Sequence, residues 1–185
     1  MNKEDMWKPF ITNVGLITCR DEKKDNVMAA AWTYHISYEP NLIAVLIDEE
    51  ATTVKMIEKS REFGVHIASI KQNILSSISG GNHGENVDKI AVLKELGYEF
   101  YEAEKIKALM IKGCALAVEC RLKDIITFGG DHKLFIGEIL KVREDEAEPL
   151  IYCESKYFKF GEKIEKPNEK EMKKIKGIIE KHKKK

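Results

Sequence analysis

The sequence predicts a mainly β protein with peripheral helices, in which a β-barrel or closed sheet carries the helices on its outside. Two observations support this fold class. About seven segments have the length of strands and are rich in apolar, β-branched and aromatic residues. A few segments between and after them have the period of amphipathic helices instead. At 185 residues, the chain is long enough for one domain with a sizeable core.

The first segments predict three strands. Residues 11–19 are apolar and β-prone, and they end at a charged turn. Residues 26–38 are also predicted to be a strand, because β-branched and aromatic residues follow Trp32 and Glu39-Pro40 ends the run. Residues 41–48 form a continuous apolar run, which is typical of a strand that is buried on both faces.

The period changes in the middle of the chain. A short helix is expected from Thr52, with a threonine as the candidate N-cap, and a strand is expected over 63–70. Residues 71–80 and 87–96 are predicted to be helical. Between them, residues 79–86 (SGGNHGEN) form a polar, glycine-rich loop.

The third part of the chain predicts long strands. Residues 108–126 are interpreted as one long strand with a bulge at Gly113, and 132–144 as its antiparallel neighbour. Both faces of 132–140 carry apolar residues, so this strand is expected to be covered on both sides. Residues 150–161 add a short last strand and a turn.

The chain ends in a basic tail, residues 166–185. Nine lysines and three glutamates give this tail a charge of 9 − 3 = +6, while the whole chain has a net charge of zero. Asn168 and Glu171 have the spacing of a capping box at the start of an amphipathic helix. We expect this helix to pack on its own domain or on a dimer partner, although a basic amphipathic helix can also touch a membrane. The predicted organisation is therefore a domain over 1–165 and a helical tail over 166–185.

Several classes of protein are excluded by what the sequence lacks. No apolar run reaches the length of a membrane span, and the first residues do not form the apolar core of a signal peptide. The basic charge is confined to the tail, which does not suggest nucleic-acid binding. Four dispersed cysteines indicate reduced thiols in the cytoplasm and no zinc site. The motifs of dinucleotide folds, P-loops, zinc proteases and serine hydrolases are absent.

Three stretches could hold a ligand. In NVMAAAWTYHISYEP, small residues would let a flat ring approach the backbone, and aromatic and polar groups follow them. In DEEATTVK, a helix N-terminus with threonines and a lysine could bind a phosphate. The third stretch, SGGNHGEN, could close over a ligand. Each has a purely structural alternative, namely a tightly packed strand, an ordinary helix cap and a surface loop.

The order of these stretches resembles the flavin reductase-like family with an FMN-binding split barrel, which includes flavoredoxins and archaeal ferric reductases. The resemblance covers roughly residues 8–160. Its most specific parts are GDHKLFIGEI and WTYHISYEPNLIAVLIDEEATTVKMIEKSREFGVHI. Two departures are Glu39-Pro40, where many relatives have two prolines, and the Asn-His-Gly loop, which is often more basic.

The resemblance implies a split β-barrel with Greek-key topology that forms a homodimer, with FMN near the dimer interface. It implies that His132 lies beside the flavin and the nicotinamide site, where Asp131 could orient its ring. The other implied FMN contacts come from the three stretches, with the phosphate expected near Thr52, Thr53 and Lys55. The full set of cofactor residues is Trp32, Thr33, Tyr34, His35, Glu49, Thr52, Thr53, Lys55, Asn82, His83 and Gly84.

The function that the resemblance implies is an FMN-binding oxidoreductase. Electrons from NADH or NADPH would pass through the flavin to free flavin, to a ferric complex or to a redox partner protein. Two alternatives stay open. One is an electron-transfer flavoprotein of flavoredoxin type without its own NAD(P)H activity. The other is a flavin- or haem-binding protein without catalytic activity.

Overall fold

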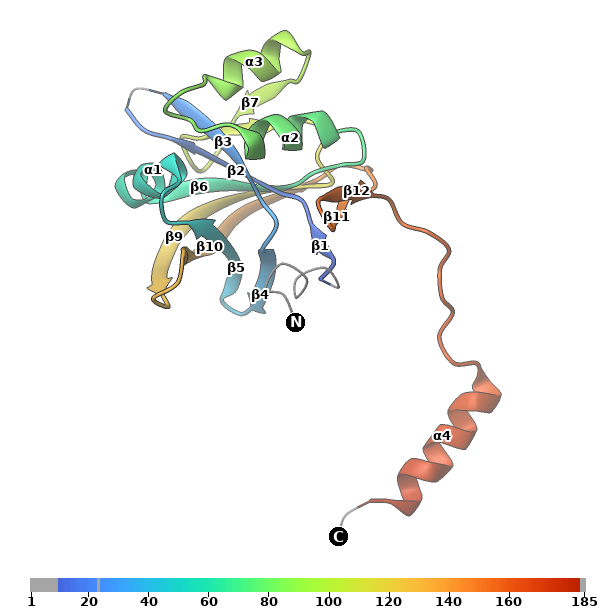
Figure 1. The fold of residues 1–185 in the computed structure, drawn as a ribbon. Coiled ribbons are helices and arrows are strands. Elements are labelled where there is room, and N and C mark those ends of the chain that lie inside the picture. The colour runs from blue at the N-terminus through green and yellow to red at the C-terminus, as the bar shows by residue number, and fades with distance from the viewer. Residues whose placement is uncertain (1–9, 23, 184–185) are drawn as a thin grey trace.

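The computed structural model describes residues 10–22 and 24–183, which contain twelve strands and four helices (Figure 1). Seven antiparallel strands form the main sheet. Their bounds are β2 Gly15–Arg20, β3 Asp25–Ala30, β4 Thr33–Tyr38, β5 Asn41–Asp48, β6 Glu62–Ile67, β9 Leu116–Thr127 and β10 His132–Glu144. Their order in space is β3-β2-β6-β9-β10-β5-β4. The fold class predicted from the sequence is therefore confirmed.

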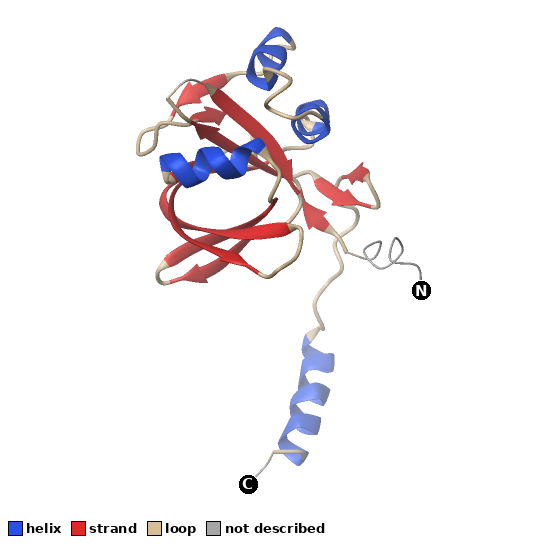
Figure 2. Ribbon diagram, turned by 60° about the vertical axis from the view of Figure 1, so that its left-hand side comes forward, coloured by secondary structure: helices blue, strands red, loops and turns tan. Residues whose placement is uncertain are grey.

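The sheet curls into a barrel that stays open along one seam (Figure 2). β3 and β4 follow each other in the chain but lie at the two ends of the strand order. The single strand predicted over 26–38 was therefore wrong, because the chain bends at Ala31 and Trp32 and crosses the seam there. One contact holds the bend in place, since the Leu46 amide donates to the Trp32 carbonyl oxygen at 3.0 Å.

Helix α1 (Thr52–Ser60) packs against the barrel interior. Its residues Val54, Met56 and Ile57 belong to the same core cluster as Phe63 and Phe135, both of which are fully buried. Burying such side chains contributes about 1.5–3 kcal/mol each. The predicted threonine cap is not formed. The N-cap residue is Ala51, and no side chain caps the helix.

A second core lies between the outside of the sheet and two helices, α2 (Asn73–Gly81) and α3 (Lys89–Glu95). β2 contributes to both cores, with Ile17 in the barrel interior and Leu16 toward the helices. Five short strands complete the fold in two small sheets, in the orders β1-β11-β12 and β7-β8. Their bounds are β1 Thr12–Asn13, β7 Phe100–Glu102, β8 Leu109–Ile111, β11 Ile151–Cys153 and β12 Lys156–Phe158.

The long strand predicted over 108–126 is interrupted. β8 ends at Ile111 and β9 begins at Leu116, and the chain turns between them at Gly113, which has a φ of +73°. This left-handed conformation favours glycine. Gly113 is therefore part of a turn between two strands, and the predicted bulge within one strand was wrong.

The outer face of β5 and β10 is covered less than the sequence predicted. The inner residues of these strands, such as Val45 and Phe135, are completely buried. On the outer side, Leu46, Leu134 and Ile136 are only half-buried. The expectation that both faces of these strands are covered was therefore wrong for the outer face. No layer of the described residues covers the apolar side chains there.

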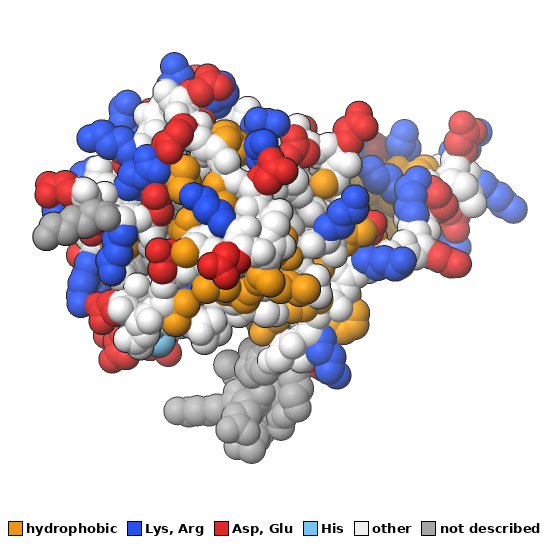
Figure 3. All heavy atoms as spheres, turned by 90° about the horizontal axis from the view of Figure 1, so that it is seen from above, with side chains coloured by type: hydrophobic (Ala, Val, Ile, Leu, Met, Phe, Trp, Pro, Cys, Tyr) orange, Lys and Arg blue, Asp and Glu red, His pale blue; other side chains and the backbone are white. Residues whose placement is uncertain are grey.

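The tail forms helix α4 (Glu169–Lys181), which begins with the expected capping box between Asn168 and Glu171. The helix projects away from the barrel, and no residue in it is buried (Figures 1 and 2). On the face seen in Figure 3, acidic and basic side chains are interspersed around a band of apolar ones. No helix among the described residues is long and apolar enough to cross a membrane.

Candidate functional site

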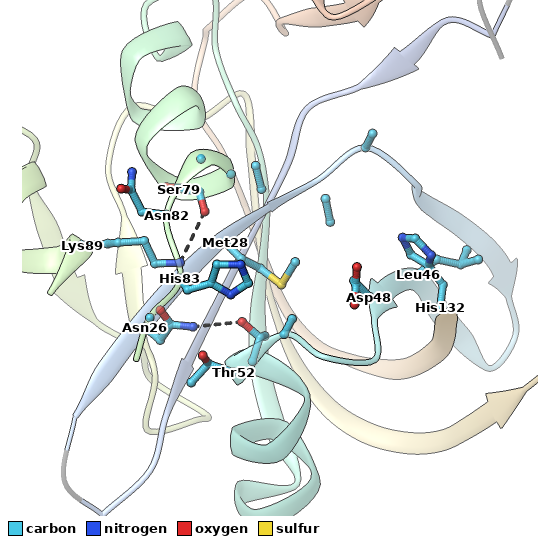
Figure 4. Close-up of a pocket in the computed structure, with 18 of the residues that line it drawn as sticks. Asn26, Met28, Leu46, Asp48, Thr52, Ser79, Asn82, His83, Lys89 and His132 are labelled. Carbon is cyan, nitrogen blue, oxygen red and sulfur yellow. Dashed lines mark hydrogen bonds between the residues drawn. The ribbon is translucent and has the colours of Figure 1, made fainter. Parts of the chain in front are cut away.

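A cavity of about 390 Å³ lies beside the barrel seam, and elements from five parts of the chain meet there (Figure 4). The seam contributes β3 and the bend after it, and the barrel contributes the ends of β5 and β10. The start of α1, the end of α2 with its following loop, and the first residue of α3 close the other side. Small side chains at Ala29, Ala30 and Ala31 leave room against the backbone of the seam.

One end of the cavity carries the rings of Trp32 and His132. Their centroids are 4.9 Å apart, with the ring planes tilted by 52°. His132 is the first residue of β10 and lies opposite Asp48, the last residue of β5. Leu46 adds an apolar surface beside them. This end therefore offers flat and apolar surfaces, with titratable groups at the mouth.

Asp131 fixes the proton arrangement of His132. A carboxylate oxygen of Asp131 lies 2.7 Å from Nδ1 of the imidazole. Because a carboxylate only accepts, Nδ1 carries the proton in this contact. The hydrogen bond from His132 lowers the pKa of the Asp131 carboxyl below its ordinary value. In a neutral ring, Nε2 is then an acceptor, and it donates a proton only when the ring is an imidazolium.

The opposite end of the cavity contains a buried cation, Lys89. Its side chain is only 4% exposed, and its Nζ donates to the Ser79 carbonyl oxygen at 3.3 Å. Among the described residues, no carboxylate forms an ion pair with it. Burial lowers the pKa of Lys89 to about 8. A buried ammonium group without an anionic partner is costly, so an anion bound here would be strongly favoured.

Two further groups at this end lack partners. The Ser79 hydroxyl is buried and has no hydrogen-bond partner among the described residues. The first turn of α1 lines the cavity through Thr52 and Thr53 and has no side-chain cap. The first amides of a helix have no intrahelical acceptor and favour an anion. Lys89, Ser79 and the start of α1 therefore together offer donors that could bind an anion.

Asn26 joins the anion end to the rest of the fold. It is buried, and its Nδ2 donates to the Thr53 hydroxyl at 2.9 Å (Figure 4). The loop after α2 packs directly on it, because a Cβ at Gly84 would lie 2.6 Å from Asn26 Oδ1. Glycine is therefore required at this position for the loop to approach the anion end so closely.

The structure brings together about half of the residues that the sequence predicted for the site. Those that line the cavity are Trp32, Thr52, Thr53, Asn82, His83, Gly84 and His132. Those that do not line it are Thr33, Tyr34, His35, Glu49 and Lys55.

The residues outside the cavity have other contacts. The Thr33 hydroxyl donates to the Ala30 carbonyl oxygen and is buried. Tyr34 lies exposed on the outer face of the sheet, and His35 contacts Asn41 at 2.8 Å. Glu49 is exposed, and its amide donates to the Asp131 carbonyl oxygen. Lys55, with a side chain 76% exposed, forms an ion pair with Glu85 at 3.7 Å.

Lys89 lies outside the three stretches that the sequence singled out, whereas Asn26, Asp48 and Ser79 are the first residues of those stretches but were not among the individually predicted contacts. For Lys89 there was a signal, because it lies four residues before Leu93 and thus on the apolar face of a predicted helix. A charged residue on a buried face is unusual and points to a function. Asn26, Asp48 and Ser79 lie within the predicted stretches, but only the packing of separate elements shows that they face the cavity and that Glu49 and Lys55 do not.

The two ends suit an elongated ligand with a flat ring system at one end and an anionic group at the other. Hydrogen-bond donors gather at Lys89, and aromatic and apolar surfaces gather at Trp32. Among the described residues, no group of three His, Cys, Asp or Glu side chains could hold a metal ion.

Comparison with known proteins identifies the family of the chain and proteins with a similar fold. The flavin reductase-like domain family matches residues 7–161 of the chain. An uncharacterized protein of Archaeoglobus fulgidus is 34% identical over 128 residues, which is 68% of each chain. The flavin reductase PheA2 has 28% identity and a TM-score of 0.72, over 86% of this chain and 96% of that one. The flavoredoxin of Desulfovibrio vulgaris (Miyazaki F) has 28% identity and a TM-score of 0.74, over 85% and 91%.

Proposed function

The chain belongs to the flavin reductase-like family, and from this premise we propose that it binds FMN and transfers electrons from NADH or NADPH to an acceptor. The fold is that of the FMN-binding split-barrel flavin reductases, and the family binds flavins.

The observation that carries the proposal is the buried, unpaired Lys89 at one end of a cavity whose other end is aromatic. In FMN, a phosphate lies at one end and a flat ring system at the other. The phosphate would accept hydrogen bonds from Lys89 Nζ, from the Ser79 hydroxyl and from the first amides of α1. Charge-assisted hydrogen bonds of this kind are among the strongest in proteins. The ring system would lie against the small residues of the seam, near Trp32 and His132.

Bound FMN supplies the redox chemistry, and the chain supplies position, charge and exclusion of water. The Ala29–Ala31 segment lets a flat ring lie close to the backbone. Because Asp131 binds Nδ1 of His132, Nε2 is left to accept a hydrogen bond when the ring is neutral or to donate one when it is protonated. No side chain is required as a nucleophile, which agrees with the absence of hydrolase and protease motifs.

The proposed assembly is a homodimer. On the outer face of β4, β5, β9 and β10, cross-strand neighbours form two rows of mainly apolar side chains. One row joins Ile126, Leu134 and Leu46. The next joins Ile136, Ala44 and Tyr34, and it ends at the exposed Asp124 of β9. A contiguous apolar surface of this kind marks an interaction site more often than a free surface.

One experiment tests the proposed function directly. After FMN is added and unbound FMN is removed by desalting, the purified protein should keep the yellow colour and visible spectrum of a flavoprotein. Stopped-flow mixing with NADH and with NADPH should then bleach the flavin absorbance rapidly with at least one of them. A protein that stays colourless with FMN would refute the proposal. Bleaching by dithionite but by neither nucleotide would instead indicate an electron-transfer role, as the name of the similar flavoredoxin suggests.

A further inference from the structure

A second cavity of about 390 Å³ adjoins the first one. The two share a wall made of Ala29, Ala30, Ala31, Gly80 and Gly81. These are the smallest residues available, so the wall between the cavities is thin. The remainder of the second cavity is lined by Asn13, Val14, Ser76, Ser77, Tyr152 and Tyr157. None of these lining residues is charged. The part of a ligand that lies in this cavity is therefore expected to be uncharged.

Two tyrosines from the β11–β12 hairpin form an aromatic wall. Their ring centroids are 5.7 Å apart, and both pack against the outer core on their other side. The Tyr157 hydroxyl lies between two serines of α2, donating to Ser76 Oγ at 3.0 Å and contacting Ser77 Oγ at 3.1 Å. This network fixes the Tyr157 ring, so its face is available to a planar ligand without reorganisation.

Asn13 supplies an unsatisfied acceptor. Its Nδ2 donates to the Thr33 carbonyl oxygen at 2.6 Å, and because a carbonyl can only accept, this contact fixes the orientation of the amide. The Oδ1 atom is buried and has no partner among the described residues. Leaving a buried acceptor unpaired costs free energy, which a ligand with an N–H group would recover.

We propose that this second cavity binds an uncharged heteroaromatic ring that carries an N–H donor, such as a carboxamide or an exocyclic amine. The ring lies against Tyr152 and Tyr157, and its donor reaches Asn13 Oδ1. The cavity is a site distinct from the anion end of the first cavity, because it shares neither Lys89 nor Ser79 with it. The inference rests on the proposed function only in that the shared wall would place this ring beside bound FMN.

The test uses nicotinamide and adenosine as two separate probes on the full chain, with and without FMN. Amide chemical shifts of 15N-labelled protein report where each probe binds, and their titration gives a dissociation constant. Shifts should concentrate at Asn13, Ser77, Tyr152 and Tyr157. N,N-dimethylnicotinamide has the same ring without an N–H donor, and it should bind about three- to tenfold more weakly than nicotinamide, as expected for one lost hydrogen bond.

Two variants on α2 form a matched pair. Ser77→Phe places a large side chain at a residue that lines only the second cavity, and it should weaken probe binding at least about tenfold. Ile74→Phe makes a similar change at an exposed position of the same helix that lines neither cavity, and it should leave binding unchanged. Asn13→Leu should remove the difference between nicotinamide and its dimethyl analogue.

The outcomes separate the two proposals. If nicotinamide or adenosine binds to the parent and Ser77→Phe abolishes this binding, the proposed second site is supported. Binding of nicotinamide would identify the carboxamide as the preferred donor, and binding of adenosine would identify the exocyclic amine. If neither probe shifts these residues, or if Ser77→Phe binds as the parent does, the inference is wrong even when FMN binds. If the probes bind but FMN does not, the proposed function fails and the second cavity stands.

Discussion

Lys89 and Lys55 illustrate why residue type and neighbouring sequence do not by themselves identify a phosphate ligand. Lys55 follows the threonines of α1 directly, yet its side chain points into solvent and pairs with Glu85. Lys89 comes from another helix, but its ammonium group is buried beside Ser79. A cation in solvent is screened and contributes little to binding, whereas a desolvated one interacts strongly with an anion.

Replacing Lys89 therefore tests the anion end. Lys89→Met should weaken FMN binding by roughly 1.5–3 kcal/mol, about tenfold to a hundredfold, because a charge-assisted hydrogen bond is lost. Riboflavin, which has no phosphate, should bind Lys89→Met and the parent equally. Flavin fluorescence quenching measures both ligands.

Lys55→Met is the matched control and should change neither affinity appreciably. Lys89→Met should also raise the melting temperature of the protein without FMN, since a buried unpaired charge is removed. Equal losses for FMN and riboflavin would show that the phosphate lies elsewhere.

His132 tests the ring end. His132→Ala should fold normally, because the side chain is 28% exposed and lies at the start of a strand. Flavin reduction by the nicotinamide nucleotide should slow by roughly one to two orders of magnitude, as expected when one positioned proton or hydrogen-bond group is lost. Stopped-flow absorbance at saturating nucleotide measures this rate.

His132→Asn separates the two roles of the ring. If His132 acts through a hydrogen bond, His132→Asn should recover part of the rate of flavin reduction. If His132 transfers a proton, His132→Asn should recover none of it. A rate for His132→Ala equal to that of the parent would mean that the histidine only ends a loop.

His66 gives the fold a predictable response to acid. It is fully buried, its Nδ1 donates to the Leu16 carbonyl oxygen, and its Nε2 accepts from the Ile111 amide. Burial lowers its pKa from 6.5 to about 4. Between these values the unfolded chain binds the proton and the folded chain does not, so stability falls as the pH drops from about 6.5 to about 4.

The expected loss from His66 is on the order of 3 kcal/mol over that range. Urea denaturation at a series of pH values measures it. His66→Gln keeps one donor and one acceptor but does not titrate, so its stability should fall less steeply over the same range. Parallel curves for His66→Gln and the parent would contradict this explanation.

At the scale of the elements, β10 lies between β9 and β5 in the barrel wall and packs tightly on the interior core at a residue without a side chain. Gly137 lies opposite Ile43 of β5 and Leu122 of β9, next to an irregularity in the β9 register. A Cβ there would lie 2.7 Å from the Phe63 ring and 2.9 Å from Cys120 Cβ. Phe63 and Cys120 are completely buried and belong to the interior core, so they have little room to move.

Gly137→Ala should therefore destabilise the protein by about 1–3 kcal/mol through overpacking. Gly81→Ala adds the same methyl group at a position where nothing lies within 4 Å, and it should leave stability unchanged or raise it slightly. Chemical denaturation compares the two variants. Equal stabilities would mean that the interior core can absorb a methyl group.

At the scale of the whole molecule, the outer face of β4, β5, β9 and β10 presents apolar side chains that the described chain leaves without a covering layer. The face contains half-buried Leu46, Leu134 and Ile136, with Tyr34 and Ile126 more exposed at its edges. His132 is on the same face of β10 as Leu134 and Ile136, so this face adjoins the Trp32–His132 pair. A second copy that covers this face would therefore stand close to the ring end of the cavity.

We expect multi-angle light scattering to give the mass of a dimer. Ile136→Lys should shift the mass toward that of a monomer, because it places a charge in the middle of the apolar face. Val92→Lys, at a residue of α3 that is 38% exposed, should leave the mass unchanged. A monomer mass for the parent protein, or a dimer mass for Ile136→Lys, would exclude this face as the interface.

The sequence by itself determined the elements whose signal is local. Alternation and apolar runs predicted most strands of the barrel, helical spacing predicted all four helices, and the Asn168–Glu171 spacing predicted the cap of α4. The order of short motifs predicted the family, and it placed Trp32, the two threonines of α1 and His132 in one site, where they line one cavity. These features depend on neighbouring residues or on motif order, which a single sequence contains.

Only the tertiary structure decided the features that depend on packing between distant segments. The bend at Ala31 and Trp32 has the composition of a continuous strand, and its position follows from closing the barrel across a seam. Apolar runs in β5 and β10 do not reveal whether their outer face is covered, because the covering layer is not part of the strand. Lys89, Ser79 and Asn26 form the anion end because α2, α3 and β3 meet there, and burial changes a lysine from a solvated charge into a binding group.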